Sequence, residues 1–132
     1  DYKLLLEKTV FENVAFAQEV IGRPKHVIKQ QVPAVLELVG LEQKAQQYPA
    51  QLSGGQKQRA GIARALVNKP SIVLADEPTG NLDQETAERV FELLMHLTRE
   101  TGVSSLVATH NPDLAARMDR KLTLKNGLLV AG

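Results

Sequence analysis

Apolar positions in the first part of the chain recur at helical spacing. Thr9 and Glu12 have the spacing of a capping box, and the apolar stripe behind them predicts a helix that ends near Gly22. A second stripe predicts a helix that closes at Gly40, where a left-handed backbone is expected. Pro33 lies inside this stripe and predicts either a kink or a first helical turn.

A third helix is expected after the polar segment 42–51. Ser53 and Gln56 again have capping-box spacing, which predicts a helix from about Gln56 to Val67, before Pro70. The first part of the chain is therefore expected to be a helical block.

The pattern then changes to alternating strands and helices. The apolar run 72–75 predicts a strand that is buried on both faces of a parallel sheet. The run 104–108 predicts a second strand, and a helix from Asp83 to Gly102 is expected between the two.

Two smaller elements are expected near the end of the chain. Asn111 and Pro112 suit the first positions of a short helix that runs through Met118. Asn126-Gly127 lies between two apolar runs and predicts a β-hairpin. Strands and helices that alternate after a helical block indicate the α/β fold class.

Polar residues follow both predicted strands. Open α/β sheets bind ligands at the carboxyl ends of their strands, where Asp76 and Glu77 are expected to lie. Asp76 suits Mg²⁺ beside nucleotide phosphates, and Glu77 suits orienting or deprotonating a water. His110 can bind a terminal phosphate or that water. Two solvated acids and a structural histidine are the alternative interpretation.

The loop Ser53-Gly54-Gly55-Gln56 precedes the third predicted helix. Its glycines let the backbone approach a ligand closely, and N–H groups at a helix start can face a phosphate. Ser53 adds a hydroxyl, unless that group is satisfied as the helix cap. Asp83 is likewise either functional or simply the cap of its own helix.

Composition narrows the classes of function. The chain has 132 residues, of which 43% are hydrophobic, enough for one domain with a core. Its net charge of +1 gives no support for nucleic-acid binding. The sequence holds no cysteine, and no apolar run approaches the ~20 residues of a membrane span. Because the chain starts abruptly and without Met, we expect it to be a fragment.

Several motifs together, in this order and spacing, resemble the ABC ATPase family. Leu52 to Arg59 resembles the family's signature, and Ile72 to Glu77 resembles its Walker B strand. Gly80 to Asp83 resembles the D-loop, and Thr109-His110 resembles the switch histidine. The resemblance covers essentially the whole chain.

The resemblance implies a P-loop NTPase (RecA-like) ABC ATPase fold that is present only in part. Residues 1–8 would follow the family's Q-loop, and residues 9–68 would form the helical subdomain with the signature loop and its helix. Residues 69–132 would be the C-terminal part of the ATP-binding core.

The resemblance also implies ATP and Mg²⁺ as cofactors and a role for each site residue. Asp76 would serve Mg²⁺, Glu77 would be the catalytic base, and His110 would contact the γ-phosphate. The γ-phosphate of the ATP held by a second subunit of a homodimer would be covered by Ser53, Gly54, Gly55 and Gln56. Asp83 would cross the interface between the two subunits.

Asp76 to Asp83 is typical of the group that contains the cell-division ATPase FtsE, the lipoprotein-releasing ATPase LolD and macrolide-exporter ATPases. Residues 1–17 look most like FtsE and residues 107–132 fit LolD about as well, and we favour FtsE. The resemblance implies an integral-membrane permease partner that is FtsX-like or LolC/LolE-like, and no nucleic acid. It also implies a peripheral position on the cytoplasmic side of the bacterial inner membrane.

The sequence lacks the phosphate-binding motif Gly-x-x-x-x-Gly-Lys-Ser/Thr, so the chain alone is expected to have no ATPase activity. Asn111 stands where an Asp often follows the switch histidine. Two alternatives stay open: a truncated module that docks on a membrane partner without hydrolysing ATP, and a DNA-repair-type ABC ATPase. The second is disfavoured by the missing coiled-coil heptads and the near-neutral charge.

Overall fold

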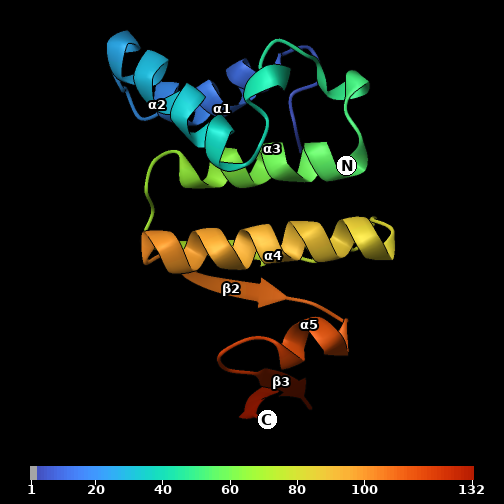
Figure 1. Cartoon of the computed structure of the whole chain (residues 1–132). Coiled ribbons are helices and arrows are strands. Elements are labelled where there is room, and N and C mark those ends of the chain that lie inside the picture. Colours follow the sequence, from blue (N-terminus) through green and yellow to red (C-terminus); the bar gives the residue numbers. More distant parts are fainter. Residues whose placement is uncertain (1–2) are drawn as a thin grey trace.

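The computed structural model describes residues 3–132 (Figure 1). Its N-terminal part is helical, as predicted. Asp1 and Tyr2, which begin the segment expected to follow the Q-loop, lie outside the described residues. The helices of this part are α1 (Val10–Glu19), α2 (Lys25–Leu38), the short 3-10 helices η1 (Glu42–Lys44) and η2 (Pro49–Gln51), and α3 (Gly54–Leu66).

The predicted capping boxes are present at the N-termini of α1 and α3. Thr9 Oγ1 accepts from the Glu12 N–H at 3.2 Å, and the Glu12 carboxylate accepts from the Thr9 N–H at 2.9 Å. Hydrogen bonds from the Thr9 N–H and then from its hydroxyl lower the pKa of Glu12. Ser53 and Gln56 form the same reciprocal pair. Both predicted capping boxes are confirmed, and α3 begins at Gly54, two residues before the predicted start near Gln56.

The predicted end of α2 is also confirmed. Gly40 has a φ of +74°, and beyond it the Leu41 N–H donates to the Leu36 carbonyl at 2.8 Å. Pro33 lies in the interior of α2, on its exposed side, rather than in its first turn.

The C-terminal part contains the predicted strands and helices. They are β1 (Ile72–Asp76), α4 (Gln84–Thr101), β2 (Ser104–Ala108), α5 (Pro112–Ala116), β3 (Leu122–Lys125) and β4 (Leu128–Ala131). β1 and β2 pair in parallel, with Asp76 opposite Ala108. β3 and β4 form a separate antiparallel hairpin whose turn residues, Asn126 and Gly127, have φ values of +51° and +78°.

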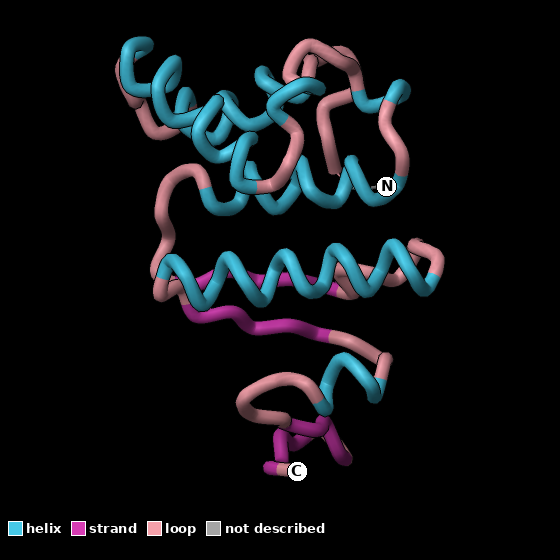
Figure 2. The backbone as a smooth tube through the Cα atoms, in the orientation of Figure 1, coloured by secondary structure: helices cyan, strands magenta, loops and turns pink. Residues whose placement is uncertain are grey.

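Helix α4 connects the two parts of the fold. In Figure 1 it lies between α3 and β2, and Figure 2 shows the strands of the parallel pair running alongside it. Val90, Leu94 and Leu97 of α4 are buried in a core shared with α1, α2, α3 and β1. Phe91 and Met95 are buried in a second cluster with Leu114 of α5. None of the helices within residues 3–132 combines the length and apolar character of a membrane span.

The prediction that β1 is buried on both faces is wrong for the described chain. Val73 is 7% exposed, whereas Ile72 and Leu74 are 54% and 72% exposed. Successive side chains of a strand point to opposite faces, and Val73 shares its core with α4. No described helix covers the face that carries Ile72 and Leu74, and Leu106 of β2 is also 58% exposed.

Asn13 ties the segment before α1 to that helix. Its side chain is 1% exposed, and its Oδ1 accepts from the Leu5 N–H at 2.7 Å. Its Nδ2 donates to the carbonyl oxygens of Leu5, Lys8 and Thr9 at 3.1, 3.1 and 2.9 Å. One buried amide therefore satisfies four backbone groups of the preceding turn.

Replacing Asn13 with Leu is expected to destabilise the protein by about 1–3 kcal/mol, because part-buried backbone groups lose their partner. Urea unfolding measures this difference. Gln30→Leu is the matched control, since Gln30 is an exposed amide on α2 and its replacement should change stability by less than about 0.5 kcal/mol. Equal unfolding midpoints for the two variants would contradict the assigned role of Asn13.

Candidate active site at the ends of β1 and β2

Glu77 follows β1 in the left-handed region of backbone space. Its φ is +45°, a conformation that costs a non-glycine residue about 1–3 kcal/mol and persists only where the surroundings hold it. Its N–H donates to the Ala108 carbonyl at 2.8 Å, and its own carbonyl accepts from the Gly80 N–H at 3.1 Å. The end of β2 and the loop that follows Glu77 thus fix the backbone of Glu77.

The carboxylate of Glu77 contacts the loop after β2 through both oxygens. Oε1 accepts from the His110 N–H at 2.6 Å, and Oε2 accepts from the Thr109 hydroxyl at 3.2 Å. The His110 imidazole is fully exposed, with Nε2 3.9 Å from Oε1. The structure therefore brings Glu77 and His110 together, but mainly through backbone, and leaves the imidazole facing solvent.

Asp76 lies beside Glu77 on the wall of a cavity. This cavity has a volume of about 670 Å³ and is also lined by Gly80, Asn81 and His110. A second cavity of about 510 Å³ lies towards α5, and both Glu77 and His110 line it as well. The predicted acid pair and histidine thus share one edge of the parallel strands.

The residues at this edge fit a magnesium ion that is held mainly by a substrate. Mg²⁺ usually keeps several waters and binds one or two carboxylates together with phosphate oxygens. Asp76 is exposed and supplies one such carboxylate. Within residues 3–132 no cluster of three or more acidic, His or Cys side chains could hold a metal by itself.

The loop Ser53 to Gln56 lies at the start of α3. Ser53 is exposed, and its Oγ accepts from the Gln56 N–H at 3.1 Å. Ser53 is therefore the N-cap of α3, which was one of the two interpretations of this hydroxyl from the sequence. That bond leaves the hydroxyl hydrogen available to donate. None of the four loop residues lines either cavity beside Glu77, so the structure does not join the two groups of predicted site residues.

Gly55 lies at a close contact between α3 and α4 that leaves no room for a side chain. A Cβ atom at this position would lie 2.7 Å from Thr86 Cγ2, closer than real Cβ atoms approach. Hydrogen bonds from the hydroxyl and the N–H of Thr86 lower the pKa of Asp83, which caps α4. Thr86 therefore lies close to both Gly55 and Asp83.

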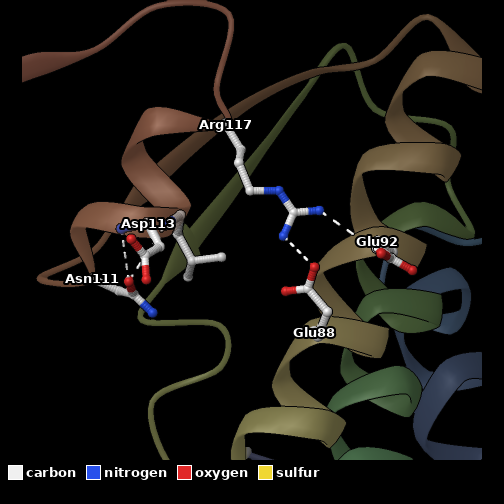
Figure 3. Close-up of polar contacts among 6 residues, drawn as sticks. Glu88, Glu92, Asn111, Asp113 and Arg117 are labelled. Carbon is white, nitrogen blue, oxygen red and sulfur yellow. Dashed lines mark hydrogen bonds and ion pairs between the residues drawn. The ribbon is translucent and has the colours of Figure 1, made fainter.

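Arg117 fixes α5 against α4 (Figure 3). Its guanidinium lies 2.5 Å from Glu88 Oε1 and 4.0 Å from Glu92 Oε1, and sits over the Phe91 ring at 4.6 Å from the centroid. Asn111 caps the other end of α5, as predicted, although the helix ends two residues before Met118. The loop that carries Thr109 and His110 is thus anchored where α5 begins and, through Arg117, where α5 ends.

Sequence reasoning missed the contacts that hold Glu77. It named Thr109 only as the neighbour of His110, and the interactions of Arg117 were not predicted. The one available signal was the position of Thr109 directly after a strand expected to lie beside the strand that ends in Asp76-Glu77.

The chain is similar in sequence to known proteins. Residues 1–80 match a family model described as ABC transporter. The lipoprotein-releasing system ATP-binding protein LolD of Shewanella oneidensis is 51% identical over 128 residues, which cover 97% of this chain and 56% of LolD. The cell division ATP-binding protein FtsE of Bacillus subtilis is 49% identical over 131 residues, with 98% and 57% covered. The chain therefore spans a little over half the length of these curated relatives.

Solved structures also match the fold of this chain. The structure of cbiO1 from Clostridium perfringens, part of the ABC transporter complex cbiONQ, matches with a TM-score of 0.87 and 29% identity. The match covers 97% of this chain and 51% of that one. A dimeric ATP-binding cassette bound to ADP and Pi matches with a TM-score of 0.78 and 37% identity, over 96% and 56% of the two chains.

Gly55→Ala is expected to destabilise the protein by about 1–3 kcal/mol, because the stiff, β-branched Thr86 cannot move its methyl group away cheaply. Thr86→Ser removes that methyl, so the double variant should regain most of the loss in a urea-unfolding cycle.

Gly61→Ala is the matched control. It lies in the same helix with nothing within 4 Å of an added Cβ, so it should be neutral or stabilising by about 0.5–1 kcal/mol. If Gly55→Ala behaves like Gly61→Ala, the α3–α4 contact does not select glycine at this position.

Proposed function

The chain belongs to the ABC transporter family, and we propose that it is part of a subunit that hydrolyses Mg-ATP to drive a membrane permease partner. The family and the α/β fold expected from the sequence are confirmed by the family model, the curated relatives and the solved neighbours. Because the chain spans 56% of its LolD relative, the activity belongs to the complete subunit and is proposed for that subunit.

The observation that carries the proposal is the carboxylate of Glu77, held at the carboxyl end of the parallel strands with Asp76 and His110 on the same cavity wall. In the proposed reaction Glu77 orients a water and takes its proton while the water oxygen attacks the γ-phosphorus and ADP leaves. Asp76 would hold Mg²⁺ beside the phosphates, and His110 would contact the γ-phosphate. The imidazole is free to do so, since its side chain is fully exposed.

We propose that the loop Ser53-Gly54-Gly55-Gln56 serves the nucleotide of a second copy of the subunit. The unused hydroxyl hydrogen of Ser53 and the first N–H groups of α3 suit a γ-phosphate. The loop lines neither cavity beside Glu77, which supports a site completed in trans. Thr86 lies close to both Asp83 and Gly55 of this loop, so Asp83 would cross the same homodimer interface.

The membrane partner is proposed to be an FtsX-like or LolC/LolE-like permease, at the cytoplasmic side of the bacterial inner membrane, without nucleic acid. Identities of 51% to LolD and 49% to FtsE do not support the preference for FtsE over LolD, so lipoprotein release and cell division are equal candidates. The exposed apolar side chains Phe16, Val20, Ile21 and Leu38 give the helical subdomain a surface suited to such a partner.

Glu77→Gln in the complete subunit is expected to lower ATP turnover by about 10²–10⁴-fold, because an amide cannot accept the proton. Binding of ATP, measured by equilibrium titration, should change by no more than a few-fold. Glu85→Gln, at an exposed position of α4 outside both cavities, should turn over ATP at the wild-type rate. The 132-residue chain by itself is expected to be inactive, since its sequence holds no phosphate-binding loop. Wild-type turnover by Glu77→Gln would refute the role of the base.

Ser53→Arg is expected to abolish ATP-dependent dimerisation, because the longer side chain would fill the position proposed for the partner's γ-phosphate. Light scattering with ATP in the Glu77→Gln background detects the dimer while ATP is not consumed. Gln30→Arg adds the same charge at an exposed position of α2 and should dimerise normally. A normal dimer from Ser53→Arg would mean that this loop does not close on a second subunit.

A further inference from the structure

Glu77 is held by a residue to which no function has been given. We propose that Thr109 is a positioning residue, whose hydroxyl fixes the carboxylate of Glu77 in the plane needed to orient the attacking water. The inference rests on the proposed role of Glu77 as the base. Thr109 is then a further residue, beside the acid pair and the histidine, on which the rate of hydrolysis depends.

The hydrogen bonds around Thr109 have a defined direction. The Asn111 N–H donates to Thr109 Oγ1 at 3.0 Å, so the hydroxyl oxygen is already an acceptor there. A carboxylate only accepts hydrogen bonds, so the hydroxyl hydrogen is the group that bonds Glu77 Oε2 at 3.2 Å. Thr109 thus connects the Glu77 carboxylate to the start of α5.

A carboxylate held by hydrogen bonds at both oxygens is restrained more than a carboxylate held at one oxygen. The torsion that rotates the carboxylate plane of a glutamate is broad and has little intrinsic preference. The His110 N–H holds Oε1, and the bond from Thr109 to Oε2 restrains rotation about that contact. Removing the hydroxyl leaves the base tethered at one oxygen and free to turn its lone pairs away from the water.

Thr109 is itself well fixed. It is half-buried directly after β2, whose last residue, Ala108, pairs with Asp76 and accepts the Glu77 N–H. Its branched Cβ restricts the side chain to few rotamers. The helix that follows is held on α4 by Arg117 (Figure 3). The hydroxyl is therefore presented to Glu77 from a rigid position.

Thr109→Val in the complete subunit tests the proposal, because valine keeps the branched shape and removes the hydroxyl. The expected result is a kcat for ATP about 10-fold lower, with KM within about twofold, since the lost bond orients the reacting water and does not bind ATP. Thr109→Ser restores the hydroxyl and should recover most of the loss. Thr101→Val, which removes a hydroxyl bonded to the Leu97 carbonyl on α4, should leave kcat unchanged.

Thermal unfolding of each variant checks that the comparison is made on folded protein. Should Thr109→Val fail to fold, Thr109→Ala removes the same hydroxyl and should show the same selective loss of kcat. In the Glu77→Gln background, Thr109→Val should cause no further loss, because the group it positions is already gone.

Two results would overturn the positioning role while leaving the proposed function intact. One is wild-type turnover by Thr109→Val alongside an inactive Glu77→Gln. The other is an equal loss in Thr109→Val and Thr109→Ser, which would assign the effect to packing rather than to the hydroxyl. Full turnover by Glu77→Gln would instead remove the proposed function, and the inference with it.

Discussion

Helix α4 is buried on two faces, and both parts of the fold pack against it. One face carries Val90, Leu94 and Leu97 into the core of the helical block, and the other carries Phe91 and Met95 towards α5. Full burial of each such side chain contributes about 1.5–3 kcal/mol, so the helix has little freedom to move relative to either neighbour. The loop at the start of α3 and the loop that precedes α5 are both positioned against this one helix.

The register of β1 and β2 brings the candidate site residues together. Parallel pairing sets Asp76 opposite Ala108, so the residues that follow the two strands emerge side by side. The strained backbone of Glu77 then turns its carboxylate towards the loop after β2 rather than along the strand. None of residues 53–56 lines either cavity at this edge, so the helix start at Ser53 is not part of the same cavity wall.

Features set by local sequence were predicted, and features set by tertiary contacts were not. The caps at Thr9 and Ser53, the turn at Asn126-Gly127 and the polar edge after β1 depend on neighbouring residues, and the structure contains them. The bond from Thr109 to Glu77 joins residues far apart in sequence and requires the strand register. The exposure of Leu74 was mispredicted because an apolar run indicates where a strand can be buried, not whether this chain supplies the cover.

A high-resolution structure of the complete subunit carrying Glu77→Gln, determined with Mg-ATP, would show which groups surround the γ-phosphate. We expect a dimer in which residue 77, Asp76 and His110 of one subunit face the same γ-phosphate, with Ser53 of the other subunit within hydrogen-bond distance of it. The amide at position 77 should still be bonded to Thr109. A nucleotide bound away from the ends of β1 and β2, or a γ-phosphate covered by Ser53 of its own subunit, would rule out the proposed site.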